Sequence, residues 1–149
     1  CIRDSWNTLV PDGLAADREA ECRAYEERIR ALGGVDLWLL GIGSNGHIAF
    51  NEPGSSCDSR TRCVKLMAET IADNSRLFAA STELPRRAFT VGVGTILEAR
   101  RVLLLATGVH KARAVAAALQ GDQGAHCPAS FLREHAHCTF VIDRPAASL

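Results

Sequence analysis

The sequence predicts an α/β fold with a parallel sheet and crossover helices. Four short, nearly continuous apolar runs are typical of parallel strands that are buried on both faces. They are residues 35–40, 88–94, 101–108 and 138–143. Between the last two runs lies an alanine-rich helical segment, residues 110–121, which ends at Gly121. A strand, a helix and a second strand joined by short loops indicate a crossover connection in a parallel sheet.

The first element is a predicted helix over residues 14–32. Its apolar residues recur at three- and four-residue spacing and therefore share one face. They are Cys22, Tyr25, Ile29 and Leu32. On the exposed faces we expect two ion pairs between residues four apart. They are Glu19 with Arg23 and Glu26 with Arg30. Gly33 and Gly34 then end the helix.

The segment 66–87 differs from the rest of the chain, because it is mixed in composition, moderately polar and interrupted by Pro85. A helix followed by a connection is the simple interpretation. A lid over a binding site is the functional alternative.

The composition indicates one globular domain over residues 1–149. Of the 149 residues, 47% are hydrophobic and 23% are charged, and 17 basic residues balance 17 acidic ones. This balance gives no field that would recruit nucleic acid or an anionic membrane surface, and no apolar run has the length of a membrane span. Six scattered cysteines without a paired spacing favour free thiols in a cytoplasmic protein.

The loop over residues 41–53 follows the first apolar run and carries the candidate catalytic residues. The carboxyl ends of strands in open α/β sheets are where ligands bind. His47 titrates near neutral pH, and Glu52 is close enough in the sequence to pair with it, as a proton shuttle requires. The alternative is that both side chains only cap the turn. A dinucleotide fingerprint fits poorly, because no helical pattern follows Gly46.

Two basic residues are candidates for anion binding. Lys111 follows a strand and the turn at Gly108, at the start of a helix, where free N–H groups favour a phosphate. A solvated lysine is the alternative. Arg76 lies in the segment 66–87 and is equally open to either interpretation. His135 and His137 invite a zinc site, but no second ligand pair stands at metal spacing, so we expect no metal.

Five motifs in order carry a resemblance to a known family. They are "GIGSNGHIAFNEPGSS" at 41–56, "SRTR" at 59–62, "NSR" at 74–76, "FTVGVGT" at 89–95 and "TGVHKA" at 107–112. Together they resemble glucosamine-6-phosphate deaminase, from about Arg18 to the end of the chain. The resemblance implies a Rossmann-like domain that converts glucosamine 6-phosphate and water to fructose 6-phosphate and ammonia without a cofactor.

The resemblance also implies roles for individual residues. His47 corresponds to the histidine that opens the pyranose ring, and Glu52 to the glutamate that supports it. Arg76 and Lys111 fall on phosphate-binding positions, and the segment 66–87 corresponds to the lid over the active site.

Some positions depart from the family pattern. Asn45 stands where some members have an aspartate near the catalytic histidine. Ser55 and Arg62 match a candidate effector-phosphate site, whereas Val64 stands where allosteric members have a lysine. The family chain is longer at its amino end, where it carries the aspartate that takes the C2 proton. We therefore expect a fold truncated at its amino-terminal side, with apolar sheet faces poorly covered and no activity alone.

Two other functions stay open. The related sugar-phosphate lactonases share the glycine-histidine core, and similar folds serve as non-catalytic sugar-phosphate sensors. We expect a small-molecule substrate. Whether the full-length form is a homo-oligomer stays open.

Overall fold

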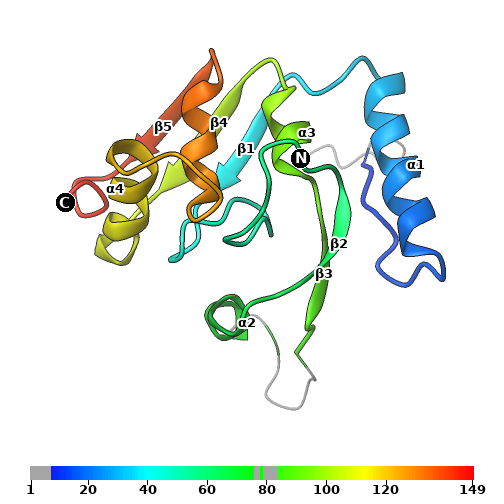
Figure 1. Cartoon of the computed structure of the whole chain (residues 1–149), viewed down its shortest axis with the longest axis horizontal. Helices are drawn as coiled ribbons and strands as arrows, with labels where there is room; N and C mark the ends of the chain where they lie inside the picture. Colours follow the sequence, from blue (N-terminus) through cyan, green and yellow to red (C-terminus); the bar gives the residue numbers. More distant parts are fainter. Residues whose placement is uncertain (1–7, 76–77, 79–83) are drawn as a thin grey trace.

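The computed structural model describes residues 8–75, 78 and 84–149. Its main sheet has three parallel strands in the order β1-β4-β5 (Figure 1). They are β1 (Trp38–Gly41), β4 (Val102–Ala106) and β5 (Cys138–Ile142). In register, Leu40 pairs with Leu104, and Leu104 pairs with Phe140. The predicted α/β fold with a parallel sheet is therefore confirmed, whereas the single-domain organisation stays a prediction.

Helices α1 and α4 lie within the ranges that the sequence predicts. Helix α1 spans Arg18–Ala31, and the side chain of Asp17 caps it by accepting a hydrogen bond from the backbone N–H of Ala20 at 2.9 Å. Its end is fixed by Gly33 and Gly34, whose φ angles of 84° and 89° suit glycine. Helix α4 spans Ala112–Gln120 and provides the crossover between β4 and β5.

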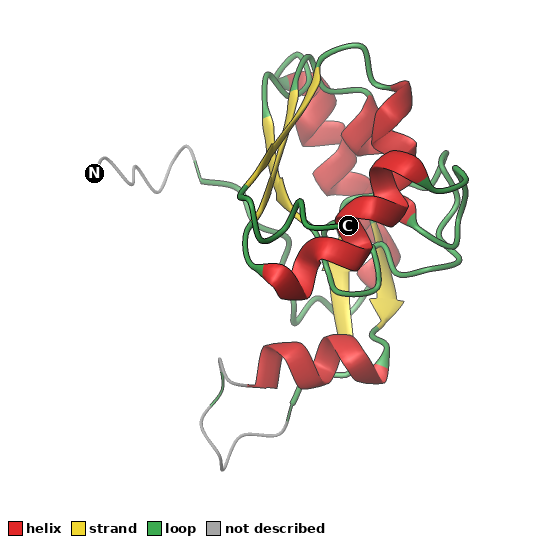
Figure 2. Ribbon diagram, turned by 90° about the vertical axis from the view of Figure 1, so that its left-hand side faces the viewer, coloured by secondary structure: helices red, strands yellow, loops and turns green. Residues whose placement is uncertain are grey.

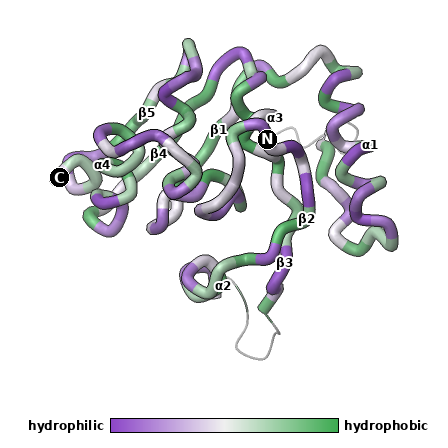
Figure 3. Tube along the Cα trace, viewed as in Figure 1, coloured by the Kyte–Doolittle hydropathy of each residue, from purple (hydrophilic) through white to green (hydrophobic). Residues whose placement is uncertain are grey.

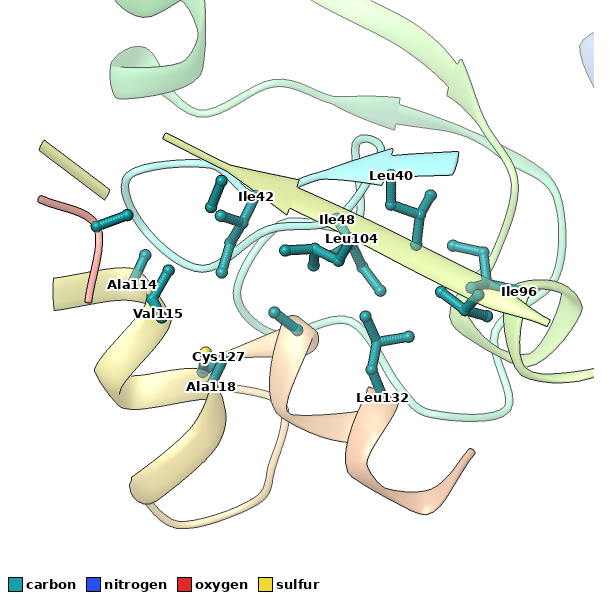
Figure 4. Packing of buried hydrophobic residues seen from close by; sticks show 14 of the residues in the cluster. Leu40, Ile42, Ile48, Ile96, Leu104, Ala114, Val115, Ala118, Cys127 and Leu132 are labelled. Carbon is teal, nitrogen blue, oxygen red and sulfur yellow. The ribbon is translucent and has the colours of Figure 1, made fainter. Parts of the chain in front are cut away.

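The core lies between one face of the sheet and the helices that cover it. Figure 4 shows Leu40 and Leu104 from the sheet facing Val115 and Ala118 of α4 and Leu132 of the 3₁₀ helix η4 (Pro128–Glu134). Alternate strand residues point into this layer because side chains in a strand alternate between faces. The core thereby fixes the carboxyl ends of β1 and β4, where the candidate site lies.

The opposite face of the sheet is open. Leu39 is 61% exposed, Leu105 is 42% exposed and Val141 is 49% exposed. Figure 2 shows most of the helical ribbon on one side of the parallel sheet, and Figure 3 shows the strands of this sheet as largely hydrophobic. Burial of the strands on both faces is therefore wrong for this chain, whereas the expectation of a poorly covered apolar face is confirmed.

The apolar run 88–94 is not a strand of the parallel sheet, which corrects the sequence-based prediction. Strand β3 (Arg87–Thr90) pairs antiparallel with β2 (Arg62–Lys65) in a separate ribbon. The chain then turns at Gly92 into the short helix α3 (Val93–Leu97). Ser59 holds this turn, because its Oγ accepts a hydrogen bond from the backbone N–H of Val93 at 3.0 Å. The two segments lie so close that a Cβ on Gly92 would be 1.9 Å from the carbonyl oxygen of Ser59.

Glu26 is buried rather than exposed, so the predicted pair with Arg30 is wrong. It is 5% exposed on α1, and its carboxylate accepts hydrogen bonds from Thr61, Thr95 and Arg60. The predicted pair of Glu19 with Arg23 is present at 3.8 Å. Glu26 therefore joins α1 to the amino end of β2 and to α3, because those elements supply its donors.

The segment 66–87 begins with helix α2 (Ala68–Asn74), which lies at the lower end of the β2–β3 ribbon in Figure 1. The predicted helix is therefore confirmed. Part of the predicted lid, residues 76–77 and 79–83, lies outside the described residues. Within the described ranges, no helix has both the length and the apolar character that a membrane crossing needs.

Candidate active site

The loop after β1 is folded tightly around His47. The backbone N–H of Gly43 donates to the carbonyl of His47 at 2.9 Å, and the N–H of Gly46 donates to the carbonyl of Gly43 at 3.0 Å. Gly46 has a φ of 84°, a conformation that side chains disfavour. The loop thus returns His47 to the carboxyl end of the sheet.

Gly43 leaves the space that the imidazole ring occupies. A Cβ at this position would lie 2.2 Å from Nδ1 and Cε1 of His47 and 2.5 Å from Nε2. Real Cβ atoms do not approach other heavy atoms this closely. The ring can therefore lie against the backbone only because residue 43 has no side chain.

Asn45 connects His47 to Glu52. The amide nitrogen of Asn45 donates to Oε2 of Glu52 at 2.9 Å, since a carboxylate can only accept. This orients the amide oxygen toward His47, where it lies 2.8 Å from Nδ1. Nδ1 must then carry the proton of this hydrogen bond, which leaves Nε2 as the nitrogen that can exchange a proton with a ligand.

Glu52 is also held by the start of α2. Its Oε1 accepts a hydrogen bond from the backbone N–H of Met67 at 3.2 Å, and its Oε2 lies 3.5 Å from Nδ1 of His47. The side chains of His47 and Glu52 are 13% and 9% exposed. The direct pair that the sequence spacing predicts is therefore present, and shorter hydrogen bonds also connect the two side chains through Asn45.

Buried Asn51 anchors the residues on either side of it. Its amide nitrogen donates to the carbonyl oxygens of Ile48 and Val91 at 3.0 and 2.8 Å, and its oxygen accepts from Arg62 at 2.9 Å. Sequence reasoning missed this role. The only signal was its position beside Glu52 in the Asn-Glu-Pro motif.

The pKa of His47 is lowered from its ordinary value. Burial is the main cause, because it disfavours the charged imidazolium, and the charge of Lys111 acts in the same direction. The carboxylates of Glu52 and Asp73 oppose both effects. Burial and the charge of Lys111 therefore favour the neutral imidazole against the two opposing carboxylates.

His47 and Lys111 line the same cavity of about 300 Å³, together with Phe50, Asp73 and Asn74. Lys111 ends the 3₁₀ turn η3 (Val109–Lys111) and precedes α4. The turn is fixed by Gly108, whose φ is 88° and whose N–H donates to both oxygens of Asp143 at 3.0 Å. The imidazole of His47 and the ammonium group of Lys111 thus border the same cavity, each from a different loop.

Arg76 lies outside the described residues, so its place relative to this cavity stays a prediction. Thr70 and Asp73 of α2 were missed, although both approach the loop. Oγ1 of Thr70 lies 3.4 Å from Nδ1 of His47, and Oδ2 of Asp73 accepts from Oγ of Ser44 at 2.9 Å. The sequence carries no local signal for these contacts.

Ser55 and Arg62 lie together beside a second cavity of about 380 Å³. The guanidinium of Arg62 donates to Oγ of Ser55 at 2.9 Å, and burial lowers its pKa. Val64 and Lys65 also line this cavity. Glu52 borders it too, so the loop that carries His47 and Glu52 lies between the two cavities.

Among residues 8–75, 78 and 84–149, no group of three His, Cys, Asp or Glu side chains could hold a metal ion. Nε2 of His135 lies 2.8 Å from the carbonyl oxygen of Ala99, and Nδ1 of His135 accepts from the N–H of His137. Both ring nitrogens of His135 therefore have backbone partners.

Residues 6–141 match the family model of glucosamine-6-phosphate isomerases and 6-phosphogluconolactonases. The chain is 52% identical over 144 residues to glucosamine-6-phosphate deaminase 1 of Giardia intestinalis, covering 96% of this chain and 54% of that protein. It thus spans about half the length of this curated relative.

The solved structures that resemble this chain include a deaminase and a lactonase of the same kinds. A monomeric glucosamine-6-phosphate deaminase superposes with a TM-score of 0.91 at 49% identity, covering 95% of this chain and 58% of that one. The 6-phosphogluconolactonase of Trypanosoma brucei superposes with a TM-score of 0.64 at 25% identity, covering 97% and 58%. This chain belongs to the family of glucosamine-6-phosphate isomerases and 6-phosphogluconolactonases.

Proposed function

We propose that this chain carries the ring-opening and phosphate-anchoring part of a glucosamine-6-phosphate deaminase. The complete reaction would convert glucosamine 6-phosphate and water to fructose 6-phosphate and ammonia. The observation that carries the proposal is the hydrogen-bonded series His47–Asn45–Glu52 at the edge of a cavity that Lys111 also lines. The similarity to the deaminases at about half identity supports the same choice.

Ring opening needs one group that can serve two oxygens. Nε2 of His47 would take the proton of the anomeric hydroxyl and return a proton to the ring oxygen while the bond from C1 to that oxygen breaks. Asn45 keeps the proton on Nδ1, so that Nε2 is the basic nitrogen, and Glu52 orients Asn45. A neutral imidazole that is poised to accept a proton fits the lowered pKa.

Lys111 would hold the phosphate group of the substrate. A charge-assisted hydrogen bond from its ammonium group anchors one end of the sugar while the other end reacts. Arg76 would add a second cation at the same group, and the segment 66–87 would act as the lid. Ser55 and Arg62 are proposed as an effector site. Val64 stands there in place of the lysine that the allosteric members have.

We also propose that the protein is cytoplasmic. The described cysteines are free thiols, as a cytoplasmic enzyme would have. The similar solved deaminase is monomeric, which gives no support to a homo-oligomer.

The test measures ammonia release from glucosamine 6-phosphate. Because the chain spans 54% of the Giardia protein, we would use a chimera in which this chain replaces the matching portion of that relative. Ammonia release with formation of fructose 6-phosphate is the expected result. Hydrolysis of a sugar-phosphate lactone without ammonia release would favour the lactonase alternative, and binding without turnover would favour a sensor.

A further inference from the structure

Asp73 brings a second carboxylate to the cavity of His47. It lies on α2, and its Oδ2 accepts a hydrogen bond from Oγ of Ser44 at 2.9 Å. Asp73, His47 and Lys111 line the same cavity of about 300 Å³. A residue of α2 is thereby tied to the loop that holds the imidazole.

The position of Asp73 is unfavourable for the helix itself. It lies in the last turn of α2, where the helix dipole disfavours negative charge and where α2 has no basic residue. Local helix stability therefore gives no reason for a carboxylate here. The hydrogen bond from Ser44 is an interaction outside the helix that offsets this cost.

Two further contacts place α2 against the same loop. Thr70 is 1% exposed, and its Oγ1 lies 3.4 Å from Nδ1 of His47. The backbone N–H of Met67, which precedes α2, donates to Glu52 at 3.2 Å. The helix is thus docked on the loop at the residue before it, in its first turn and in its last turn.

Three charged side chains act on His47 among the described residues, each from a different element. Glu52 lies on the loop, Asp73 on α2 and Lys111 on the turn before α4. Glu52 already accepts hydrogen bonds from Asn45 and Met67. Asp73 accepts from Ser44 and borders the open cavity, so its charge is placed to act on the imidazole from the side of α2.

We propose that Asp73 is a positioning residue for His47, whose carboxylate ties α2 to the histidine loop through Ser44 and stabilises the protonated imidazole. Docking of α2 and protonation of His47 then favour each other, since coupling between two equilibria is reciprocal. In the proposed ring opening, on which this consequence rests, Asp73 would offset the effects of burial and Lys111 and help His47 to accept a proton.

The first experiment titrates His47 by NMR in the isolated 149-residue chain. Asp73→Asn removes the charge but keeps an oxygen that can accept from Ser44, whereas Ser44→Ala removes the hydrogen bond and keeps the charge. Glu69→Gln is the matched control, because Glu69 is an exposed acid on the same helix. We expect Asp73→Asn to lower the titration midpoint of His47 by about half a unit. Ser44→Ala should lower it less, and Glu69→Gln should leave it unchanged.

Either of two results would overturn the proposal. One is an unchanged midpoint in Asp73→Asn. The other is an equal shift in Glu69→Gln, which would mean that any negative charge on α2 has the same effect. The proton chemical shifts of the three variants report whether each one is folded.

A second readout tests the coupling. Hydrogen exchange of the α2 amides should be slower when His47 is protonated, after correction for the intrinsic pH dependence of exchange. Asp73→Asn should abolish this difference, and an undiminished difference in that variant would contradict the coupling. Neither experiment measures turnover. Failure of the titration therefore leaves the deaminase proposal standing, and failure of ammonia release leaves the titration result standing.

Discussion

The amide oxygen of Asn45 lies 2.8 Å from Nδ1 of His47, so a neutral side chain orients the imidazole. Some members of the family have an aspartate at this position. An amide can fix the tautomer as well as a carboxylate can, but it adds no charge that would stabilise the imidazolium.

We therefore predict that Asn45→Asp raises the pKa of His47, by about one unit, because it places a negative charge within hydrogen-bond distance. NMR titration of the His47 ring in the isolated chain measures the change. A midpoint equal to that of the unmodified chain would show that residue 45 does not set the charge of the imidazole.

Gly43→Ala should displace the ring of His47, because the new Cβ would lie 2.2 Å from two ring atoms. We expect the ring resonances to shift and ammonia release by the chimera to fall by at least tenfold. Gly41→Ala is the matched control, since a Cβ there meets nothing within 4 Å. Equal activities of the two variants would argue against close packing of the ring on residue 43.

Glu26→Gln should lower the free energy of unfolding by about 2–3 kcal/mol at pH 7. Burial alone would raise the pKa of Glu26, but hydrogen bonds from Thr61, Thr95 and Arg60 lower it from 4.5 to about 2. Because the folded-state pKa is the lower one, this stabilisation is present above pH 4.5 and is lost as the pH falls toward 2.

Urea unfolding at several pH values measures this effect. The difference between the unmodified chain and Glu26→Gln should shrink between pH 4.5 and the acid limit. Glu19→Gln is the control, because Glu19 forms an exposed pair with Arg23, and it should change stability by less than about 0.5 kcal/mol. A similar small effect at Glu26 would contradict the role of its buried hydrogen bonds.

Burial of Glu26 shows where sequence reasoning fails in this fold. Its spacing from Arg30 is typical of an exposed ion pair, and that local pattern was the only information in the helix. The residues that hold its carboxylate, Thr61 and Thr95, lie 35 and 69 positions away. Only the packing of α1 on β2 and α3 brings them together, so tertiary contacts override the local pattern.

The strands and the loop of His47 were predictable for a different reason. Strands β1, β4 and β5 follow from continuous apolar runs, and the loop follows from the glycines after β1. The run 88–94 misled because its first residues form β3 in the separate antiparallel ribbon, whereas Val93 is a core residue of α3. A short apolar run does not distinguish a helix from a strand. Asp73 could not be predicted, since its contact with Ser44 spans 29 residues.

Lys111→Met should raise the KM of the chimera for glucosamine 6-phosphate by roughly tenfold to a hundredfold, since it removes the charge-assisted hydrogen bond that we propose between Lys111 and the phosphate. A smaller change in kcat is expected. Arg113→Met is the control, because Arg113 is an exposed cation in the first turn of α4. An unchanged KM in Lys111→Met would make this residue a solvated lysine without a binding role.

The central claim is that His47 opens the sugar ring, and two rates measured on the chimera and on its His47→Ala variant test it most directly. One is turnover of ring-closed glucosamine 6-phosphate, and the other is solvent hydrogen exchange at C2 of the open-chain form. We predict that His47→Ala slows turnover of the ring-closed sugar far more than it slows the exchange. Equal losses in the two rates would contradict the claim.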